Sequence, residues 1–325
     1  MAALDGGSQV PAGKPTRILF LSSSSFGIPP LQALLADSRY QVVGLIAQPD
    51  KPAGRGLRVV PAAIVQVARR ALVPVLQPAD LRSPSAMAEA QALAPDLVVV
   101  AAYGQWIPAG VYEYPPLGSL NIHPSLLPRH RGAAPAMSAL LAGDRVAGVT
   151  ILFVVEEMDA GDILAQAALA IEPDDTTATL MNRLALLGAR LLSDTLPAYL
   201  AGRIEPRPQD HCRATWFGRV CKEMGRIDWS EPAELIRRKV QAYTPWPTAF
   251  TTYAGRRLRI VAAECREWQG PEAPGTVVRT PEGVNVVTGE GALLLRRVQW
   301  AGKRELETEA FARGQRGFIG ARLGY

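Results

Sequence analysis

Cysteine and histidine are scarce in this sequence, and both scarcities limit the chemistry that it can support. The 325 residues include three histidines and three cysteines, Cys212, Cys221 and Cys265, and no two of the cysteines form a Cys-x-x-Cys pair. An odd and scattered set of cysteines argues against a disulfide framework and against a zinc site. We therefore expect a soluble protein of a reducing cytoplasm.

Long hydrophobic runs are also absent. Runs such as DLVVVAAY at 96–103 fall far short of the roughly 20 apolar residues that a membrane span needs. The first residues, MAALDGGSQVPAGKPTR, contain no apolar core of the signal-peptide type. Residues 1–15 are mostly small or polar and include Pro and Gly, a composition that predicts a disordered tail. No membrane partner is expected.

Two nucleotide-binding signatures are missing. The turn after the first predicted strand reads SSSSFGIPP without a G-x-G-x-x-G motif, and the chain contains no G-x-x-x-x-G-K-[ST]. The first motif is typical of dinucleotide-binding proteins, and the second is typical of P-loop NTPases. Both of these classes are therefore disfavoured.

Hydrophobic patterns in residues 16–203 predict a mostly parallel, Rossmann-like α/β domain. Short branched apolar runs alternate with segments whose apolar residues recur at helical spacing. Such strands form a sheet covered by helices on both faces, and its ligands bind beyond the carboxyl ends of the strands. The predicted strands lie at 17–21, 41–47, 73–77, 96–103, 118–123, 148–155 and 162–171, and the predicted helices at 29–37, 61–71, 84–93, 133–143 and 174–202.

The pattern changes after residue 203. Residues 204–215 are polar with two prolines, which predicts a linker. In residues 216–325 one predicted helix precedes several short strands separated by turn signals, a pattern typical of a small β-barrel. Residues 207–325 carry 20 Lys and Arg against 13 Asp and Glu (+7), whereas residues 1–206 carry 15 against 17 (−2). The asymmetry fits a polyanionic partner and a solvated basic surface equally well.

A polar pair ends the strand predicted at 118–123. Asn121 offers an amide N–H to a developing oxyanion, and His123 points to the same face and can exchange a proton near neutral pH. A carboxylate that orients the imidazole could come from the acidic loop at 156–162, which follows the strand at 148–155. Taken alone, these residues fit a catalytic site about as well as a structural histidine beside a solvated turn. The four candidate carboxylates are Glu156, Glu157, Asp159 and Asp162.

The stretch SLNIHPSLLPRHRGAAP at 119–135, with AYG at 102–104 and MDAGD at 158–162, resembles the folate-dependent formyltransferase superfamily. That superfamily carries an Asn-x-His-x-Ser-Leu-Leu-Pro signature and a later carboxylate in an Asp-x-Gly context. Further segments resemble its tRNA-acting branch, and the matches span about residues 16–310. These segments are AQPDKPAGRGLR (47–58), RGAAP (131–135), RIDWS (226–230), TPWP (244–247), APGTVV (273–278) and AGKR (301–304).

The resemblance implies a fold, a reaction and the residues that carry it out. The fold would be a formyltransferase domain at 16–203 followed by an OB-like, tRNA-binding barrel at 216–325. The formyl group of 10-formyltetrahydrofolate, a co-substrate, would pass to the α-amine of methionine on initiator methionyl-tRNA for translation initiation, in a monomer without metal. The implied catalytic residues are Asn121, His123 and Asp159, and the implied folate-binding residues are Ser125, Leu126, Leu127, Pro128, Tyr103 and Gly104.

The loop at 47–61 combines Lys51, Arg55 and Arg58 with prolines and glycines. A basic loop suits a nucleic-acid backbone, although its composition alone equally fits a plain surface loop. In the family the loop enters the acceptor end of the tRNA, Arg55 matches its most important arginine, and a weak or mismatched first base pair is read. The resemblance therefore implies that Lys51, Arg55 and Arg58 contact tRNA.

Two positions depart from the family pattern. Ser22–Ser25 stand where a Gly-Thr pair usually follows the first strand, which leaves the geometry of that turn open. His130 is expected to face solvent and is assigned no catalytic role. Three alternatives remain open: formyl transfer to glycinamide ribonucleotide or an amino sugar, hydrolysis of formyl-folate, and RNA binding without catalysis. Relatives of the first kind lack the PAGRG, RIDW and PWP segments, and the intact Asn121, His123 and Asp159 disfavour the last.

Overall fold

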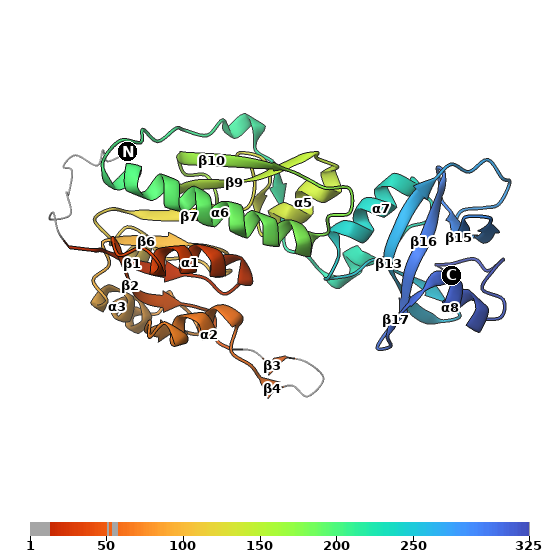
Figure 1. Ribbon diagram of the computed structural model, residues 1–325, viewed down its shortest axis with the longest axis horizontal. Helices are drawn as coiled ribbons and strands as arrows, with labels where there is room; N and C mark the ends of the chain where they lie inside the picture. Colours follow the sequence, from red (N-terminus) through yellow and green to blue (C-terminus); the bar gives the residue numbers. More distant parts are fainter. Residues whose placement is uncertain (1–13, 51, 54–57, 325) are drawn as a thin grey trace. The chain divides into compact units, whose positions relative to one another are not determined.

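The computed structural model describes residues 14–50, 52, 53 and 58–324, and for residues 52, 53, 58 and 59 it describes the backbone alone. The chain forms two compact units (Figure 1). The first comprises residues 1–135, 146–170 and 181–217, and the second comprises 136–145, 171–180 and 218–325. The segment predicted as a linker, 204–215, thus belongs to the first unit by its contacts. Most of the predicted tail lies outside the described residues.

The first unit is built on a seven-stranded sheet with the order β10-β9-β7-β6-β1-β2-β5. Five neighbouring strands from β5 to β7 run parallel, which confirms the predicted mostly parallel α/β class. β9 and β10 run antiparallel because one short loop joins them and no crossover helix intervenes. The strands are β1 (Thr16–Leu21), β2 (Tyr40–Ile46), β5 (Val75–Leu76), β6 (Leu97–Val100), β7 (Ser119–His123), β9 (Val146–Phe153) and β10 (Ile163–Ala170).

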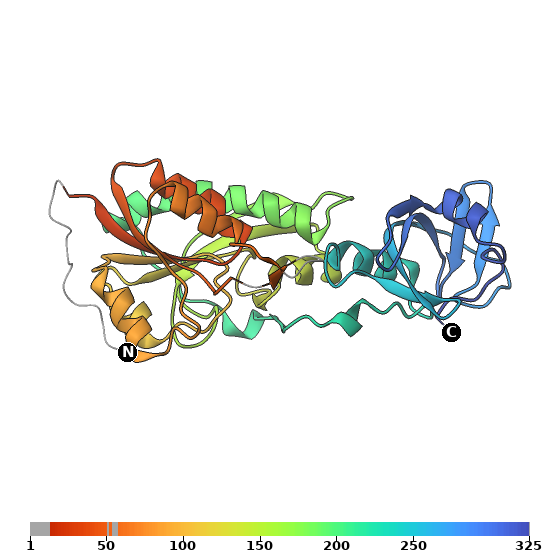
Figure 2. The same cartoon turned by 90° about the horizontal axis from the view of Figure 1, so that it is seen from below.

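Helices cover both faces of this sheet. In Figure 2, α1 and the long α6 lie on one side and α3 lies on the other. Proline begins α1 and α3, where its missing N–H group is not needed, and the Ser83 hydroxyl caps α3 by accepting from Ala86 N at 3.3 Å. The helices of the first unit are η1 (Ser25–Gly27), α1 (Ile28–Leu35), α2 (Ala63–Arg70), α3 (Pro84–Ala92), α4 (Ala109–Tyr112), most of α6 (Thr177–Leu200) and η2 (His211–Arg213). All of α5 (Pro135–Ala142) except Pro135 belongs to the second unit.

The packing of α6 decides which way β7 presents its side chains. Gly188 of α6 lies so close to the sheet that a Cβ there would be 3.0 Å from Cγ2 of Ile122. Leu120 and Ile122 are fully buried and share this face of β7. Because side chains alternate along a strand, Asn121 and His123 point to the opposite face.

The remaining short strands are β3 (Pro52–Ala53), β4 (Arg58–Val59), β8 (Arg131–Gly132) and β11 (Trp216–Phe217), and β8 pairs with β11 in parallel.

The second unit contains a curled antiparallel sheet of the order β12-β13-β16-β15-β14, with β17 paired to β16. Register shifts in β13 next to Ala262 bend the strand, as β-bulges do. Its core includes Trp229, Ile236, Leu258 and Phe318, and the small barrel predicted from the sequence is confirmed as this half-barrel. The elements are η3 (Lys222–Gly225), α7 (Ala233–Ala242), β12 (Phe250–Tyr253), β13 (Arg256–Arg266), β14 (Val277–Thr280), β15 (Gly283–Val287), β16 (Ala292–Trp300), β17 (Glu305–Glu307) and α8 (Thr308–Gly314).

Among the described residues, none of the helices is both long enough and apolar enough to cross a membrane.

Candidate active site

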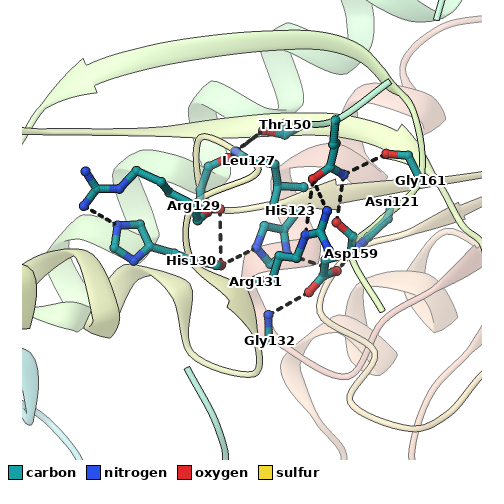
Figure 3. A network of polar contacts seen from close by, with 12 residues as sticks. Asn121, His123, Leu127, Arg129, His130, Arg131, Gly132, Thr150, Asp159 and Gly161 are labelled. Carbon is teal, nitrogen blue, oxygen red and sulfur yellow. Dashed lines mark hydrogen bonds and ion pairs between the residues drawn. The ribbon is translucent and has the colours of Figure 1, made fainter. Parts of the chain in front are cut away.

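Asn121 and His123 lie at the carboxyl end of β7, where β6 pairs with it in parallel and β9 in antiparallel. His123 is 4% exposed, and Asn121 is half-buried. Figure 3 shows the two side chains on one side of the strand, next to the loop that follows β9. The carboxyl end of a parallel strand is where ligands of such sheets bind, so both residues lie where chemistry is expected.

Asp159 brings a carboxylate to this pair. Its Oδ1 lies 3.4 Å from His123 Nδ1 and accepts from Asn121 Nδ2 at 3.3 Å, and its Oδ2 accepts from Gly132 N at 2.8 Å. The structure thus brings together the three residues that were predicted to be catalytic (Figure 3). Of the other candidate carboxylates, Glu156 and Asp162 are exposed, and Glu157 is also exposed and pairs with Arg131 at 3.1 Å.

The second nitrogen of the His123 ring also faces an acceptor. His123 Nε2 donates to the carbonyl oxygen of His130 at 2.9 Å. A carbonyl oxygen can only accept, so this nitrogen carries a hydrogen, and the carboxylate of Asp159 faces the other nitrogen. The two contacts hold the imidazole ring between the Asp159 carboxylate and the His130 carbonyl oxygen.

His130 corrects one expectation. The residue was expected to face solvent, but it is 5% exposed and its backbone has a φ of 59°. The left-handed conformation turns its carbonyl toward His123, since His130 N is held at 2.8 Å by the Thr215 hydroxyl. Its contribution to the site is thus made through the backbone.

The predicted folate segment, Ser125–Pro128, follows directly after His123. The Ser125 hydroxyl donates to Arg129 O at 2.8 Å, and Leu127 N donates to the Thr150 hydroxyl at 3.1 Å. Leu126 packs against Gly148 of β9 and fills the space that a side chain at position 148 would need. These contacts hold the segment against the sheet beside Asn121, His123 and Asp159. Its role in folate binding stays a prediction.

Tyr103 and Gly104 follow the carboxyl end of β6, the strand next to β7. Tyr103 is 2% exposed, and burial raises the pKa of its hydroxyl to about 12, so the phenol stays neutral. Its carbonyl oxygen accepts from Gln48 Nε2 at 3.0 Å, and Gly104 has a φ of 79°. The Tyr103 ring belongs to the hydrophobic core of the sheet, so any contribution to a pocket comes from the backbone.

The serine-rich turn that departs from the family pattern is built by its own hydroxyl groups. Ser24 accepts from Phe26 N at 3.2 Å, and Ser23 accepts from Gln48 N at 2.8 Å. Ser22 is fully buried against Gly27, where a Cβ would clash with it. The hydroxyl groups thus close the turn between β1 and α1.

The predicted tRNA contacts cannot be placed in the same way. Lys51 and Arg55 lie outside the described residues, and of Arg58 only the backbone, in β4, is described.

Groups of three or more His, Cys, Asp or Glu side chains suited to a metal ion do not occur in the described parts of the chain.

Sequence reasoning missed two residues behind the cluster. Arg131 is 1% exposed and Gln209 is 6% exposed, and Arg131 Nη2 donates to Gln209 Oε1 at 2.8 Å. Arg131 begins the segment RGAAP, which lies in the stretch that carries the resemblance, so it offered a usable signal. Gln209 had no such signal, because it falls in the polar stretch predicted as a linker.

Family profiles match both parts of the chain. The profile described as "Formyl transferase" matches residues 16–196, and that described as "Formyl transferase, C-terminal domain" matches residues 219–316. The methionyl-tRNA formyltransferase of Roseiflexus castenholzii is 50% identical over 309 residues, which cover 95% of this chain and 99% of that protein. The chain belongs to the methionyl-tRNA formyltransferase family. The Bacillus velezensis member is 39% identical over 92% of this chain and 95% of its own length.

Solved structures at lower sequence identity share the fold. HypX from Aquifex aeolicus, solved in complex with tetrahydrofolic acid, superposes with a TM-score of 0.61 at 22% identity, over 94% of this chain and 48% of that one. A likeness at this identity shows the architecture alone. Family membership makes the chain a formyltransferase that uses formyl-tetrahydrofolate.

Proposed function

We propose that this chain transfers the formyl group of 10-formyltetrahydrofolate to the α-amino group of methionine on initiator methionyl-tRNA. Support comes from family membership over 95% of the chain. The single observation that carries the proposal is the meeting of Asn121, His123 and Asp159 at the carboxyl end of β7. The same proposal includes a cytoplasmic location and a monomeric state for this enzyme.

Asn121 is the oxyanion donor in this scheme. The α-amine attacks the formyl carbon, a C–N bond forms, and the formyl oxygen becomes an oxyanion until the bond to the folate nitrogen breaks. One N–H group of the Asn121 amide is held by Asp159 at 3.3 Å, and we assign the second to the oxyanion. A donor of this kind is worth roughly 100- to 1,000-fold in rate.

His123 and Asp159 handle charge and protons. The attacking amine loses a proton and the folate nitrogen gains one, so the site needs a group that can hold and release protons. His123 suits this role because its nitrogens face the Asp159 carboxylate and the His130 carbonyl. The Asp159 carboxylate keeps the ring oriented.

Replacement of Asp159 by asparagine tests these assignments. Asp159→Asn removes the negative charge but keeps the size of the side chain, so we expect turnover to be abolished while both substrates still bind. Single-turnover formylation and tRNA binding measure the two effects separately. Asp194→Asn, an exposed position on α6, is the matched control and should behave as wild type. Near-normal turnover of Asp159→Asn would contradict the assigned roles.

The amine substrate is tested with the unmodified protein. The protein is mixed with 10-formyltetrahydrofolate and methionine-charged initiator or elongator tRNA. The amino acid is then released from the tRNA, and its mass is measured. Formylmethionine on the initiator tRNA but not on the elongator tRNA supports the proposal. If neither tRNA gains a formyl group while glycinamide ribonucleotide or an amino sugar does, the chemistry stands and the substrate is wrong.

Contacts to tRNA remain part of the proposal. Lys51, Arg55 and Arg58 are proposed to contact the acceptor end, with Arg55 the most important. The basic second half, residues 207–325 with a net charge of +7, would add contacts to phosphates.

A further inference from the structure

Gln209 holds the loop that carries Asp159. Its side-chain nitrogen donates to the carbonyl oxygens of Asp159 at 2.8 Å and Gly161 at 2.7 Å, so both of its N–H groups are used inside the protein. Asp159 itself has a φ of 55°. A non-glycine residue in this conformation costs about 1–3 kcal/mol and persists only where its surroundings hold it. The two hydrogen bonds from Gln209, to the carbonyl oxygen of the strained residue and to that of Gly161 two residues later, are such a restraint.

Arg131 fixes the orientation of the Gln209 amide. Gln209 Oε1 accepts from Arg131 Nη2 at 2.8 Å and from Nε at 3.3 Å. The guanidinium is almost fully buried and lies 5.6 Å from the centre of the Trp216 ring. A cation can only donate, so the amide oxygen must face Arg131 and the amide nitrogen must face the Asp159 loop. The orientation is thus determined by charge.

The same stretch of chain also supports His123. The Thr215 hydroxyl accepts from His130 N at 2.8 Å, and Thr215 O accepts from Arg131 N at 2.8 Å. These bonds hold His130 in the conformation that turns its carbonyl oxygen toward His123 Nε2. Residues 209–217 therefore hold the Asp159 loop with one side chain and the partner of His123 with another.

We propose that Gln209 is a positioning residue for Asp159, and that residues 209–217 are a working part of the catalytic site. Gln209 touches neither reacting group and acts through the loop whose shape decides where the Asp159 carboxylate lies. The inference rests on the proposed function, because Asp159 must take part in formyl transfer for its position to matter.

Two substitutions separate positioning from mere filling of space. Gln209→Ala removes both the donors and the acceptor. Gln209→Glu keeps the size and the contact with Arg131 but removes the two donors, and it places a carboxylate against two carbonyl oxygens. We expect kcat to fall about 10- to 100-fold in both variants, since displacements of about 1 Å cost this much. The KM for 10-formyltetrahydrofolate and the KM for methionyl-tRNA should stay within about twofold of wild type.

Gln91→Ala is the matched control. Gln91 is likewise a glutamine whose side-chain nitrogen donates to a backbone carbonyl, that of Gly110 at 2.7 Å, but it is half-buried and lies on α3. It should lose stability, read as the Tm, without a change in kcat. Normal kcat in folded Gln209→Ala and Gln209→Glu would overturn the inference, as would a change confined to KM or an equal loss of kcat in Gln91→Ala. An inactive wild-type protein would instead count against the proposed function.

Discussion

At the residue scale, the site rests on backbone conformations that L-amino acids seldom adopt. Asp159, His130 and Gly132 have φ values of 55°, 59° and 103°, and each one contacts His123 or Asp159. Such conformations cluster at functional sites, where surrounding hydrogen bonds maintain them. Asn121, His123 and Asp159 could be identified from the sequence motifs. The hydrogen bonds that keep them in place come from residues whose types do not indicate a functional role.

Gly132 gives a direct test of this dependence. A Cβ there would collide with the carbonyl oxygen of Phe217, and the Gly132 N–H group is the partner of Asp159 Oδ2. Because of this clash, we expect Gly132→Ala to lower the free energy of unfolding by about 1–3 kcal/mol more than the same change at a control glycine, and to lower kcat as well. Gly202→Ala is that control, because Gly202 has a φ of 66° and no atom near its missing Cβ. Chemical denaturation and steady-state kinetics measure both effects, and equal stability losses with unchanged kcat would contradict the expectation.

The three cysteines should differ in reactivity. Burial, followed by its hydrogen bond to Glu234, raises the pKa of the Cys265 thiol to about 11, whereas Cys212 and Cys221 are exposed. With a pKa of about 11, only about one Cys265 in a thousand is a thiolate at pH 8. A thiol-specific reagent at pH 8 should modify Cys212 and Cys221 quickly and Cys265 slowly, and all three at similar rates in denaturant. Fast labelling of Cys265 in the folded protein, located by peptide mass, would refute this.

At the element scale, periodicity predicted the long strands and helices and missed the shortest ones. The strand β7 and the helix α6 lie close to their predicted ranges, since each has enough residues to show a pattern. The pair β8 and β11 has two residues in each strand, which is too short for any periodicity. That pair nevertheless brings residues 216–217 to the site, because a β-bridge is a long-range contact that composition does not record.

The helix α7 carries a pH-dependent contribution to stability. Hydrogen bonds from Arg237, with a smaller contribution from Arg238, lower the pKa of Glu234 to about 2 from an ordinary value of 4.5. A carboxylate with a lowered folded-state pKa stabilises the fold above pH 4.5, and this stability is lost as the pH falls from about 4.5 toward 2. Since Glu234 is 46% exposed, solvent weakens the effect.

Glu234→Gln should therefore flatten the loss of stability between pH 5 and pH 3, as measured by denaturant titration at each pH. The exposed Glu267→Gln is the control for removal of one negative charge and should leave the slope close to that of wild type. An identical pH slope in wild type and Glu234→Gln would show that the ion pair does not couple to folding.

At the scale of the whole molecule, compact units and continuous stretches of sequence do not coincide. Residues 136–145 and 171–180 belong by contact to the second unit, although they lie within the predicted first domain. Hydrogen bonds explain this: Arg238 Nη1 donates to Ala142 O at 3.4 Å, the Thr177 hydroxyl to Ala242 O at 2.6 Å, and Gln241 Nε2 to Pro173 O at 2.5 Å. Single polar contacts of this kind leave no periodic trace in a sequence.

By itself, the sequence determined the α/β class, the half-barrel and the candidate catalytic side chains, because hydrophobic period and local motifs are properties of neighbouring residues. The resemblance already pointed to Asp159 among the four acidic residues of one loop. Only the tertiary structure decided how its carboxylate is held beside His123, since that depends on a φ of 55° and on bonds from Gly132 and Gln209. It also decided that a polar stretch resembling a linker lies against the loop that carries Asp159. Contacts between residues 50 positions apart, such as Gln209 and Asp159, arise when the chain folds and are encoded in no local pattern.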